Sequence, residues 1–128
     1  MANEAFGSTD TILSITLTAS QQNSTVLYPK GAELLFLYSN FDYSSSNLND
    51  FRVEISDDGG TTWRIEPLTW RTTALSADEK WRSVVNLGYV QGTNANRQVR
   101  VGATGAGTTG TLVVKARFNR RPYPAFTA

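Results

Sequence analysis

Alternation of apolar and polar residues is the feature that most limits what this chain can fold into. It runs through segments 13–17, 51–55 and 112–118, in each of which every second residue is apolar. A period of two places all the apolar side chains of a strand on one face, whereas a helix needs a period near 3.6. The pattern therefore predicts strands with one buried and one wetter face.

Other short apolar segments raise the expected number of strands to about eight. They are separated by turn-forming residues and lie at 25–28, 34–37, 62–68, 81–87 and 97–103. The run 34–37 is apolar on both faces, which predicts a central strand covered on both sides. A chain of 128 residues has room for one hydrophobic core. We therefore expect a single all-β domain over 1–128, an antiparallel β-sandwich of jelly-roll type.

Composition predicts loops between some of these strands and one short helical turn. Segment 39–50 is rich in Ser, Asn and Asp and is expected to be a long exposed loop. Segment 102–110 alternates Gly, Ala and Thr, as a flexible hairpin connection would. Ser76 and Glu79 have the spacing of a capping box, so a single helical turn is expected there.

Both ends of the chain are expected to be extended arms, over residues 1–9 and 119–128. The C-terminal segment contains Pro122 and Pro124, which cannot continue a central strand because proline lacks the ladder donor. The two ends also carry apolar and basic groups for which a free tail has no use. We expect the interface with a partner to use Phe6, Arg117, Arg120, Arg121, Tyr123 and Phe126.

The residue types that are missing exclude several kinds of reactive site. The chain has no cysteine, so disulfides and thiolate chemistry are ruled out. It has no histidine either, which excludes a Ser-His-Asp triad and a histidine-bound zinc.

Two carboxylate pairs and one oxygen-rich loop are further candidate sites. The pairs 57/58 and 78/79 resemble the two carboxylates of glycosidases, but a turn and a helix cap explain them. Calcium would suit the oxygen donors of one loop, although they lack EF-hand spacing: Asp42, Asn47, Asn49 and Asp50. We expect no enzymatic activity, no cofactor and no metal site.

Charge is unevenly distributed along the chain, although the net charge is only +1. All eleven acidic residues lie in the first 79 positions, and eight of the twelve basic residues lie from Lys80 onward. Such a basic segment can mark a nucleic-acid or acidic partner. Because a sandwich interleaves both halves of its chain, we expect the charges to neutralise one another and nucleic acid not to be a partner. Alternatively, an acidic face on one subunit meets a basic face on the next.

One motif is specific. Residues 56–63, Ser-Asp-Asp-Gly-Gly-Thr-Thr-Trp, match the Asp-box pattern Ser-x-Asp-x-Gly-x-Thr-Trp of sialidases and other β-rich proteins. The resemblance implies a hairpin turn in which Ser56 and Asp58 bind turn amides, Gly60 relaxes the backbone and Trp63 packs underneath. The flanking residues agree, because strands are expected on both sides and Asp-Gly-Gly suits positive φ. If Trp63 is buried, its removal should cost about 3–5 kcal/mol.

The Asp-box resemblance covers eight residues and implies a local structure, not an activity. Sialidases carry several such boxes in a propeller, together with an arginine cluster and a tyrosine-glutamate pair. This chain has one box, at Ser56, Asp58, Gly60, Thr62 and Trp63, and is too short for a propeller. We therefore expect no sialidase activity.

The chain as a whole is similar to small virion proteins of tailed bacteriophages, above all capsid cement or decoration proteins. The shared character is a short, cysteine-free β domain rich in Ser, Thr, Asn and Gly, with extended arms. The resemblance implies a structural protein that binds neighbouring capsid or tail subunits and self-associates. It also implies a place in the virion after synthesis in the host cytoplasm. The first residues lack signal-peptide features, and no apolar run approaches the ~18 residues of a membrane span.

A carbohydrate-binding β-sandwich, such as a receptor-binding or adhesion module, is the alternative. The same scaffold hosts both functions. Aromatic faces suit sugar rings, and a platform would draw on Tyr38, Tyr43, Trp70, Trp81 and Tyr89.

Overall fold

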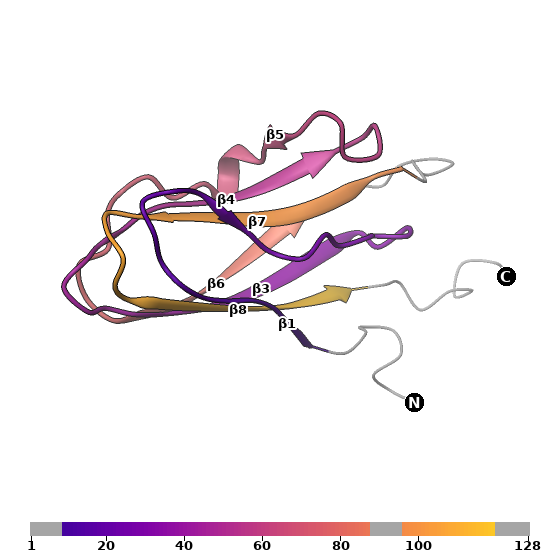
Figure 1. Ribbon diagram of the computed structural model, residues 1–128. Coiled ribbons are helices and arrows are strands. Elements are labelled where there is room, and N and C mark those ends of the chain that lie inside the picture. Colours follow the sequence, from indigo (N-terminus) through magenta and orange to yellow (C-terminus); the bar gives the residue numbers. More distant parts are fainter. Residues whose placement is uncertain (1–8, 88–95, 120–128) are drawn as a thin grey trace, which may run out of the picture.

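A computed structural model describes residues 9–87 and 96–119 of the chain. These residues form two antiparallel sheets of four strands each, stacked as the two layers of a β-sandwich (Figure 1). The strands are β1 (Asp10–Thr16), β2 (Gln22–Asn23), β3 (Leu34–Asp42), β4 (Leu48–Ser56), β5 (Arg64–Ile65), β6 (Glu79–Asn86), β7 (Gln98–Gly105) and β8 (Thr111–Asn119). The expected all-β class is confirmed.

The strand order is that of a jelly roll. The first sheet, sheet A, has the order β1-β8-β3-β6, and the second, sheet B, has the order β2-β7-β4-β5. The first strand therefore pairs with the last, the second with the seventh, the third with the sixth and the fourth with the fifth. This nesting of pairs, shared between two packed sheets, is the eight-stranded double-sheet arrangement of jelly rolls.

Alternation along the strands builds the core between the two sheets. In β3 every second residue from Leu35 to Phe41 is buried, and in β4 the side chains of Phe51, Val53 and Ile55 point inward. Phe41 and Phe51 are fully buried and are the largest side chains of this core. Since burial of an apolar side chain of this size contributes about 1.5–3 kcal/mol, the inward positions dominate the stability of the fold.

Sheet A has one open side. The prediction that 34–37 is a central strand is right, because β3 lies between β8 and β6. The prediction that it is covered on both sides is wrong for the described chain, because Leu34 and Phe36 face outward and are only half-buried. Antiparallel sheets commonly keep one face in contact with water.

The two shortest strands differ from expectation because their ladders are interrupted. The predicted strand at 25–28 is reduced to an isolated bridge between Leu27 and Val99, and regular pairing occurs earlier, in β2. The predicted strand at 62–68 is reduced to β5 and gives way to the 3-10 turn η2 (Pro67–Thr69). Pro67 lacks an N–H and cannot extend the ladder.

Strands extend into segments for which loops are predicted. The expected long loop 39–50 is confined to 43–47, because Ser39 and Phe41 continue the buried face of β3 and Leu48 is buried at the start of β4. Likewise β7 continues to Gly105, so the connection to β8 is only 106–110.

Two further boundaries also move. No helical turn forms at 76–79, since Glu79 opens β6 opposite Phe41. Asn119 pairs with Leu34 as the last residue of β8, so the expected C-terminal arm loses its first residue to the sheet. Within the described ranges, no helix is long and apolar enough to cross a membrane.

Candidate functional site

The Asp-box motif forms the turn that the resemblance implies, between β4 and β5. Asp58 Oδ1 accepts hydrogen bonds from the amides of Thr61 at 3.1 Å and Thr62 at 2.8 Å, and from the Ser56 hydroxyl at 2.7 Å. Ser56 Oγ in turn accepts from the Gly60 amide at 2.9 Å. Gly60 has a φ of +96°, a conformation that residues with a Cβ rarely adopt. The motif is therefore a structural turn, which the Gly59 amide also links to the Asn96 carbonyl at 3.2 Å.

Trp63 packs against the turn, as the resemblance implies, but it is less buried than expected. Its indole N–H donates to the Gly60 carbonyl at 3.1 Å, but the side chain is only half-buried and is not part of the core. The Arg100 guanidinium lies over the ring, 4.1 Å from its centroid. The condition of full burial is therefore not met, and the cost of about 3–5 kcal/mol does not apply. The indole instead closes the outer face of sheet B through a cation-π contact.

The turn predicts a specific pH dependence. Hydrogen bonds from the backbone of Thr62, and further ones from Ser56 and Thr61, lower the pKa of Asp58 from 3.8 to about 2. Because the folded-state pKa is depressed, the stabilisation is present above the unfolded pKa and is lost as pH falls through about 2. We expect the melting temperature of Asp58→Asn to fall less than that of the wild type between about pH 4 and pH 2.

The measurement is thermal melting by circular dichroism at a series of pH values. Asp42→Asn serves as the control, because Asp42 is exposed and lies outside the turn. The same loss of stability in Asp58→Asn and the wild type over that pH range would show that this carboxylate does not hold the turn.

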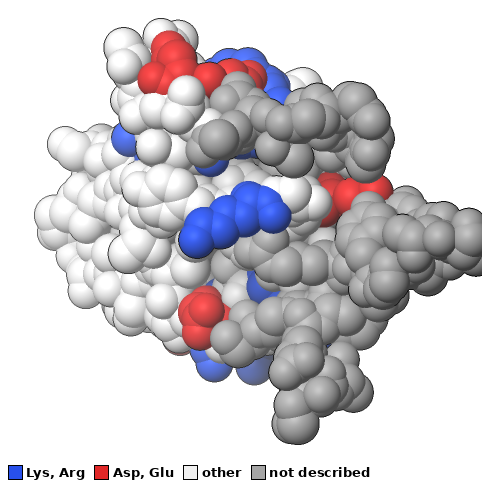
Figure 2. Space-filling model, turned by 90° about the vertical axis from the view of Figure 1, so that its right-hand side faces the viewer, with Lys and Arg blue, Asp and Glu red and all other residues white. Residues whose placement is uncertain are grey.

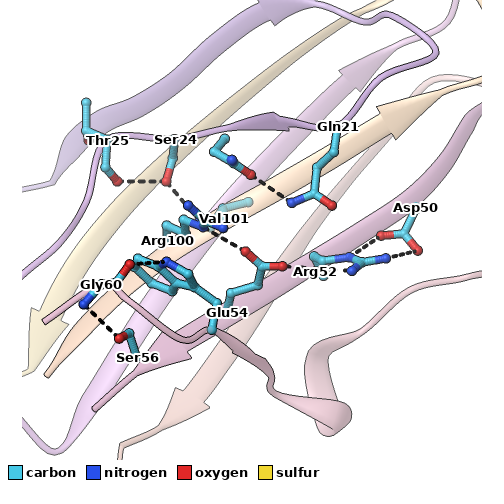
Figure 3. Close-up of polar contacts among 12 residues, drawn as sticks. Gln21, Ser24, Thr25, Asp50, Arg52, Glu54, Ser56, Gly60, Arg100 and Val101 are labelled. Carbon is cyan, nitrogen blue, oxygen red and sulfur yellow. Dashed lines mark hydrogen bonds and ion pairs between the residues drawn. The ribbon is translucent and has the colours of Figure 1, made fainter. Parts of the chain in front are cut away.

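The outer face of sheet B carries a ladder of matched charges, formed by Asp50, Arg52, Glu54 and Arg100 (Figure 3). Glu54 is 7% exposed and lies between two guanidinium groups, with Arg100 Nε at 2.7 Å and Arg52 Nη1 at 3.8 Å from its oxygens. Such a carboxylate is held only because its charge is paired and hydrogen-bonded.

The ladder ends at a second tryptophan. Arg52 Nε donates to Asp50 Oδ1 at 2.8 Å, and the Trp70 indole N–H donates to Asp50 Oδ2 at 2.9 Å. The Arg52 guanidinium lies 5.3 Å from the centroid of the Trp70 ring. Burial alone would raise the pKa of Asp50, but the hydrogen bonds from Arg52 and Trp70 outweigh it and lower that pKa. Every charged side chain in the ladder has an ion-pair partner. The ladder therefore stabilises sheet B and offers no unpaired charge to a ligand.

A projecting turn stands at the edge of sheet B next to the ladder. It consists of η2 (Pro67–Thr69) and Trp70, and Leu68 at its centre is 90% exposed. Glu66 accepts hydrogen bonds from the Leu68 amide at 3.2 Å and from the Thr69 hydroxyl at 3.3 Å. Trp70, itself 41% exposed, is held by Asp50 and Arg52. The fold thus fixes a large apolar group in water.

Sheet A presents a different outer face, which we term the basic face. Its positions alternate with the buried ones along the three strands β6, β3 and β8. The side chains on it are Lys80, Arg82 and Val84 of β6, Phe36, Tyr38 and Asn40 of β3, and Val113, Lys115 and Arg117 of β8.

The expected neutralisation of charge therefore holds for one sheet and fails for the other. Of the basic residues after position 79, Arg100 pairs with Glu54, and Arg97 pairs with Asp57 at 2.8 Å. The Arg97 hydrogen bond also lowers the pKa of Asp57. Figure 2 shows acidic and basic side chains interspersed at one end of the molecule. By contrast, four basic residues collect on the outer face of sheet A: Lys80, Arg82, Lys115 and Arg117.

Most of the predicted interface lies outside the described residues. Arg117 is the exception: it belongs to β8, and its guanidinium lies 5.2 Å from the centroid of the Phe36 ring. The others are Phe6, Arg120, Arg121, Tyr123 and Phe126.

The predicted aromatic platform does not assemble. Tyr38 faces outward from sheet A, whereas the Trp81 ring turns inward and packs edge-on against Phe51, 5.2 Å between centroids. Trp70 lies beside the ladder of sheet B, and Tyr43 packs edge-on against buried Phe41. The fifth aromatic, Tyr89, is outside the described residues.

The oxygen donors of the predicted calcium loop are not brought together either. Asp42 ends β3, Asn49 and Asp50 lie within β4, and Asp50 is engaged by Arg52 and Trp70. Over residues 9–87 and 96–119, no group of three His, Cys, Asp or Glu residues is arranged to hold a metal ion.

The fold and its faces define the chain as a jelly-roll β-sandwich with one face of paired charges and one basic face. Comparison with models of known protein families and with curated protein sequences gives no match. Function is therefore inferred from the geometry of the chain itself.

Proposed function

We propose that this chain is a non-enzymatic structural protein of a tailed-bacteriophage virion, which binds neighbouring capsid or tail subunits and self-associates. The jelly roll supports this proposal, since viral capsid domains are among the proteins built on it. The resemblance in composition to cement and decoration proteins points the same way. The single observation that carries the proposal is the projecting turn, which presents an apolar anchor for a partner.

The projecting turn has the properties of an interface anchor. Single exposed apolar side chains are common on protein surfaces, but here several contacts fix the backbone that carries one. The Glu66 carboxylate caps the turn, Pro67 fixes its first backbone angle, and the Trp70 amide donates back to the Pro67 carbonyl at 3.4 Å. A group that is ordered before binding loses less conformational entropy on docking, so more of its contact energy appears as affinity.

Leu68 and Trp70 would contact a partner in different ways. Leu68 can enter a pocket on the neighbouring subunit, because it extends beyond the surface and makes few contacts of its own. Trp70 lies beside it with its polar N–H already satisfied by Asp50, so only its apolar face remains for a partner. Tryptophan is among the residues that contribute most of the energy in typical interfaces, and burial of Leu68 would add apolar area.

Leu68→Ser should weaken incorporation into particles by about 30-fold or more, the loss expected for a hot-spot residue. The isolated chain should melt within about 2 °C of the wild type, since the leucine side chain is in water in the free protein. The measurement is binding of purified chain to particles assembled without it, and Leu68→Met should bind nearly normally.

Tyr28→Ser is the matched control, because Tyr28 is also exposed but lies outside the projecting turn. If mass spectrometry of purified particles does not detect the chain, the virion proposal fails. If the chain is in the particle and Leu68→Ser binds as the wild type does, the anchor lies elsewhere, and deletion of residues 120–128 should then reduce incorporation.

A glycan array separates this proposal from the carbohydrate-binding alternative. The four described aromatic residues of the predicted platform are not on one face, so no signal is expected. Reproducible binding of one glycan at micromolar affinity would favour the sugar-binding function instead.

A further inference from the structure

The basic face has a regular order that follows from strand register. Tyr38 on the central strand pairs with Arg82 on one side and Lys115 on the other. One step along the same face, Phe36 pairs with Val84 and Arg117. Since alternate residues of a strand are about 6.8 Å apart and neighbouring strands about 4.8 Å apart, the basic residues form two rows roughly 10 Å apart. The aromatic side chains lie between these rows.

Three cations of these rows have no acid on the same face as an ion-pair partner within the described chain. Among the described residues, no ion pair involves Lys80, Arg82 or Lys115. The carboxylates nearest in register are Asp10 of the edge strand β1, opposite Ala116, and Asp42, which ends β3 opposite Thr111. The centre of the face is therefore positively charged, although the whole chain carries a net charge of only +1.

Of the two aromatic rings, Tyr38 lines an open depression on the described surface. An open depression of about 570 Å³ lies over this part of sheet A, and its lining includes Tyr38, Lys80, Arg82 and Lys115. No other ring or guanidinium group of the described chain is stacked on Tyr38, whereas the Phe36 ring is overlaid by Arg117. A planar group can therefore stack on Tyr38 between two cationic side chains.

We propose that the basic face binds single-stranded nucleic acid, an activity that does not depend on the docking proposed above. Proteins that bind single strands combine cationic side chains along the phosphate backbone with aromatic rings on which bases stack. Four-stranded antiparallel sheets do so with aromatic residues on their central strands. Sheet A has both parts, with Tyr38 and Phe36 on its central strand β3 and Lys80, Arg82, Lys115 and Arg117 on the flanking strands.

Two other anionic partners fit the face less well. A duplex keeps its bases stacked on each other, so it could contact the cations but not Tyr38. An acidic protein surface likewise pairs with the cations, but it has no planar base for the ring. A contribution of Tyr38 to the binding affinity therefore distinguishes a single strand from a duplex and from an acidic protein surface.

The test measures fluorescence anisotropy of a labelled oligothymidylate of about 12 nucleotides titrated with the full chain, at several salt concentrations. Three phosphate contacts, from Lys80, Arg82 and Lys115, should give a log-log salt slope of about 2, and a duplex of the same length should bind more weakly. Lys115→Gln and Arg82→Gln should each reduce the slope by about 0.7. Arg64→Gln removes the same charge from the opposite sheet and should leave the slope unchanged.

Stacking is tested at Tyr38. Tyr38→Leu should weaken binding by roughly 5- to 100-fold with the salt slope unchanged, because it removes a ring and no charge. Tyr38→Phe keeps the ring and should bind nearly as the wild type does.

Three outcomes would overturn the proposal: no binding at low salt, equal loss in Lys115→Gln and Arg64→Gln, or equal affinity of Tyr38→Leu and wild type. A further result would identify the partner as an acidic protein surface and make the nucleic-acid proposal wrong. In that case poly-glutamate displaces the oligonucleotide in a way that depends on Lys115 and Arg82, and Tyr38→Leu leaves the affinity unchanged.

Discussion

Phe51→Ala should destabilise the fold by about 3–5 kcal/mol, the range for removal of a fully buried aromatic side chain. Phe51 points from β4 into the space between the sheets, has no exposed surface, and packs edge-on against the Trp81 ring of sheet A. Its removal leaves a cavity and takes away one partner of Trp81. The midpoint of thermal unfolding should fall by more than about 10 °C.

The measurement is urea unfolding followed by tryptophan fluorescence, because the linear dependence on denaturant gives the free energy of unfolding. Val84→Ala is the control: its side chain is 52% exposed on the outer face of sheet A, and its loss should cost within about 0.5 kcal/mol. A loss below about 1 kcal/mol in Phe51→Ala would mean that the two sheets do not pack through this residue.

Glu54→Ala should cost about 2–3 kcal/mol, the second largest effect we expect. Removing one member of a buried ion pair typically costs about 3–5 kcal/mol, because the remaining charge loses its compensation. Here the side chains of Arg52 and Arg100 remain about a quarter exposed, so water recovers part of that loss. Arg52 also keeps its bonds to Asp50, and Arg100 keeps the Trp63 ring.

An exposed ion pair of the same chain provides the matched control. Glu79 bonds to Arg71 at 2.8 Å, but its side chain is 40% exposed, so Glu79→Ala should cost only about 0–1 kcal/mol. Both variants are compared by urea unfolding, with Glu54→Gln expected to lie between Glu54→Ala and wild type because it keeps the hydrogen-bonding oxygen. An equal decrease in the free energy of unfolding in Glu54→Ala and Glu79→Ala would show that the ladder stabilises the fold no more than an exposed ion pair does.

Local patterns are enough to predict the class of the fold and one of its turns. The alternation through 51–55 and 112–118 identifies β4 and β8 and the inward faces of both. This works because the side chains of a strand alternate whatever lies next to it. The Asp-box is equally predictable, since Ser56, Asp58 and Gly60 form their main hydrogen bonds to one another within five residues.

Strand ends are predicted less well because they depend on partners far away in sequence. The residue type of Ser39 favours a loop, yet Ser39 pairs with both Trp81 and Val114 within sheet A. The spacing of Glu79 from Ser76 favours a helical turn, yet Glu79 is held opposite Phe41 and bonded to Arg71. Backbone pairing and burial in the folded chain outweigh such local preferences.

What the sequence by itself determined is therefore the all-β class, the inward faces of β4 and β8, and the Asp-box turn. It also placed Lys115 and Arg117 on the wetter face of one strand. Only the tertiary structure decided that β8 and β6 flank β3, which brings those residues beside Tyr38 and Arg82. It likewise paired Arg97 and Arg100 with acids from the first half of the chain. The reason is physical: alternation is a property of each strand alone, whereas the neighbours of a strand are set by how the two sheets bury their shared core.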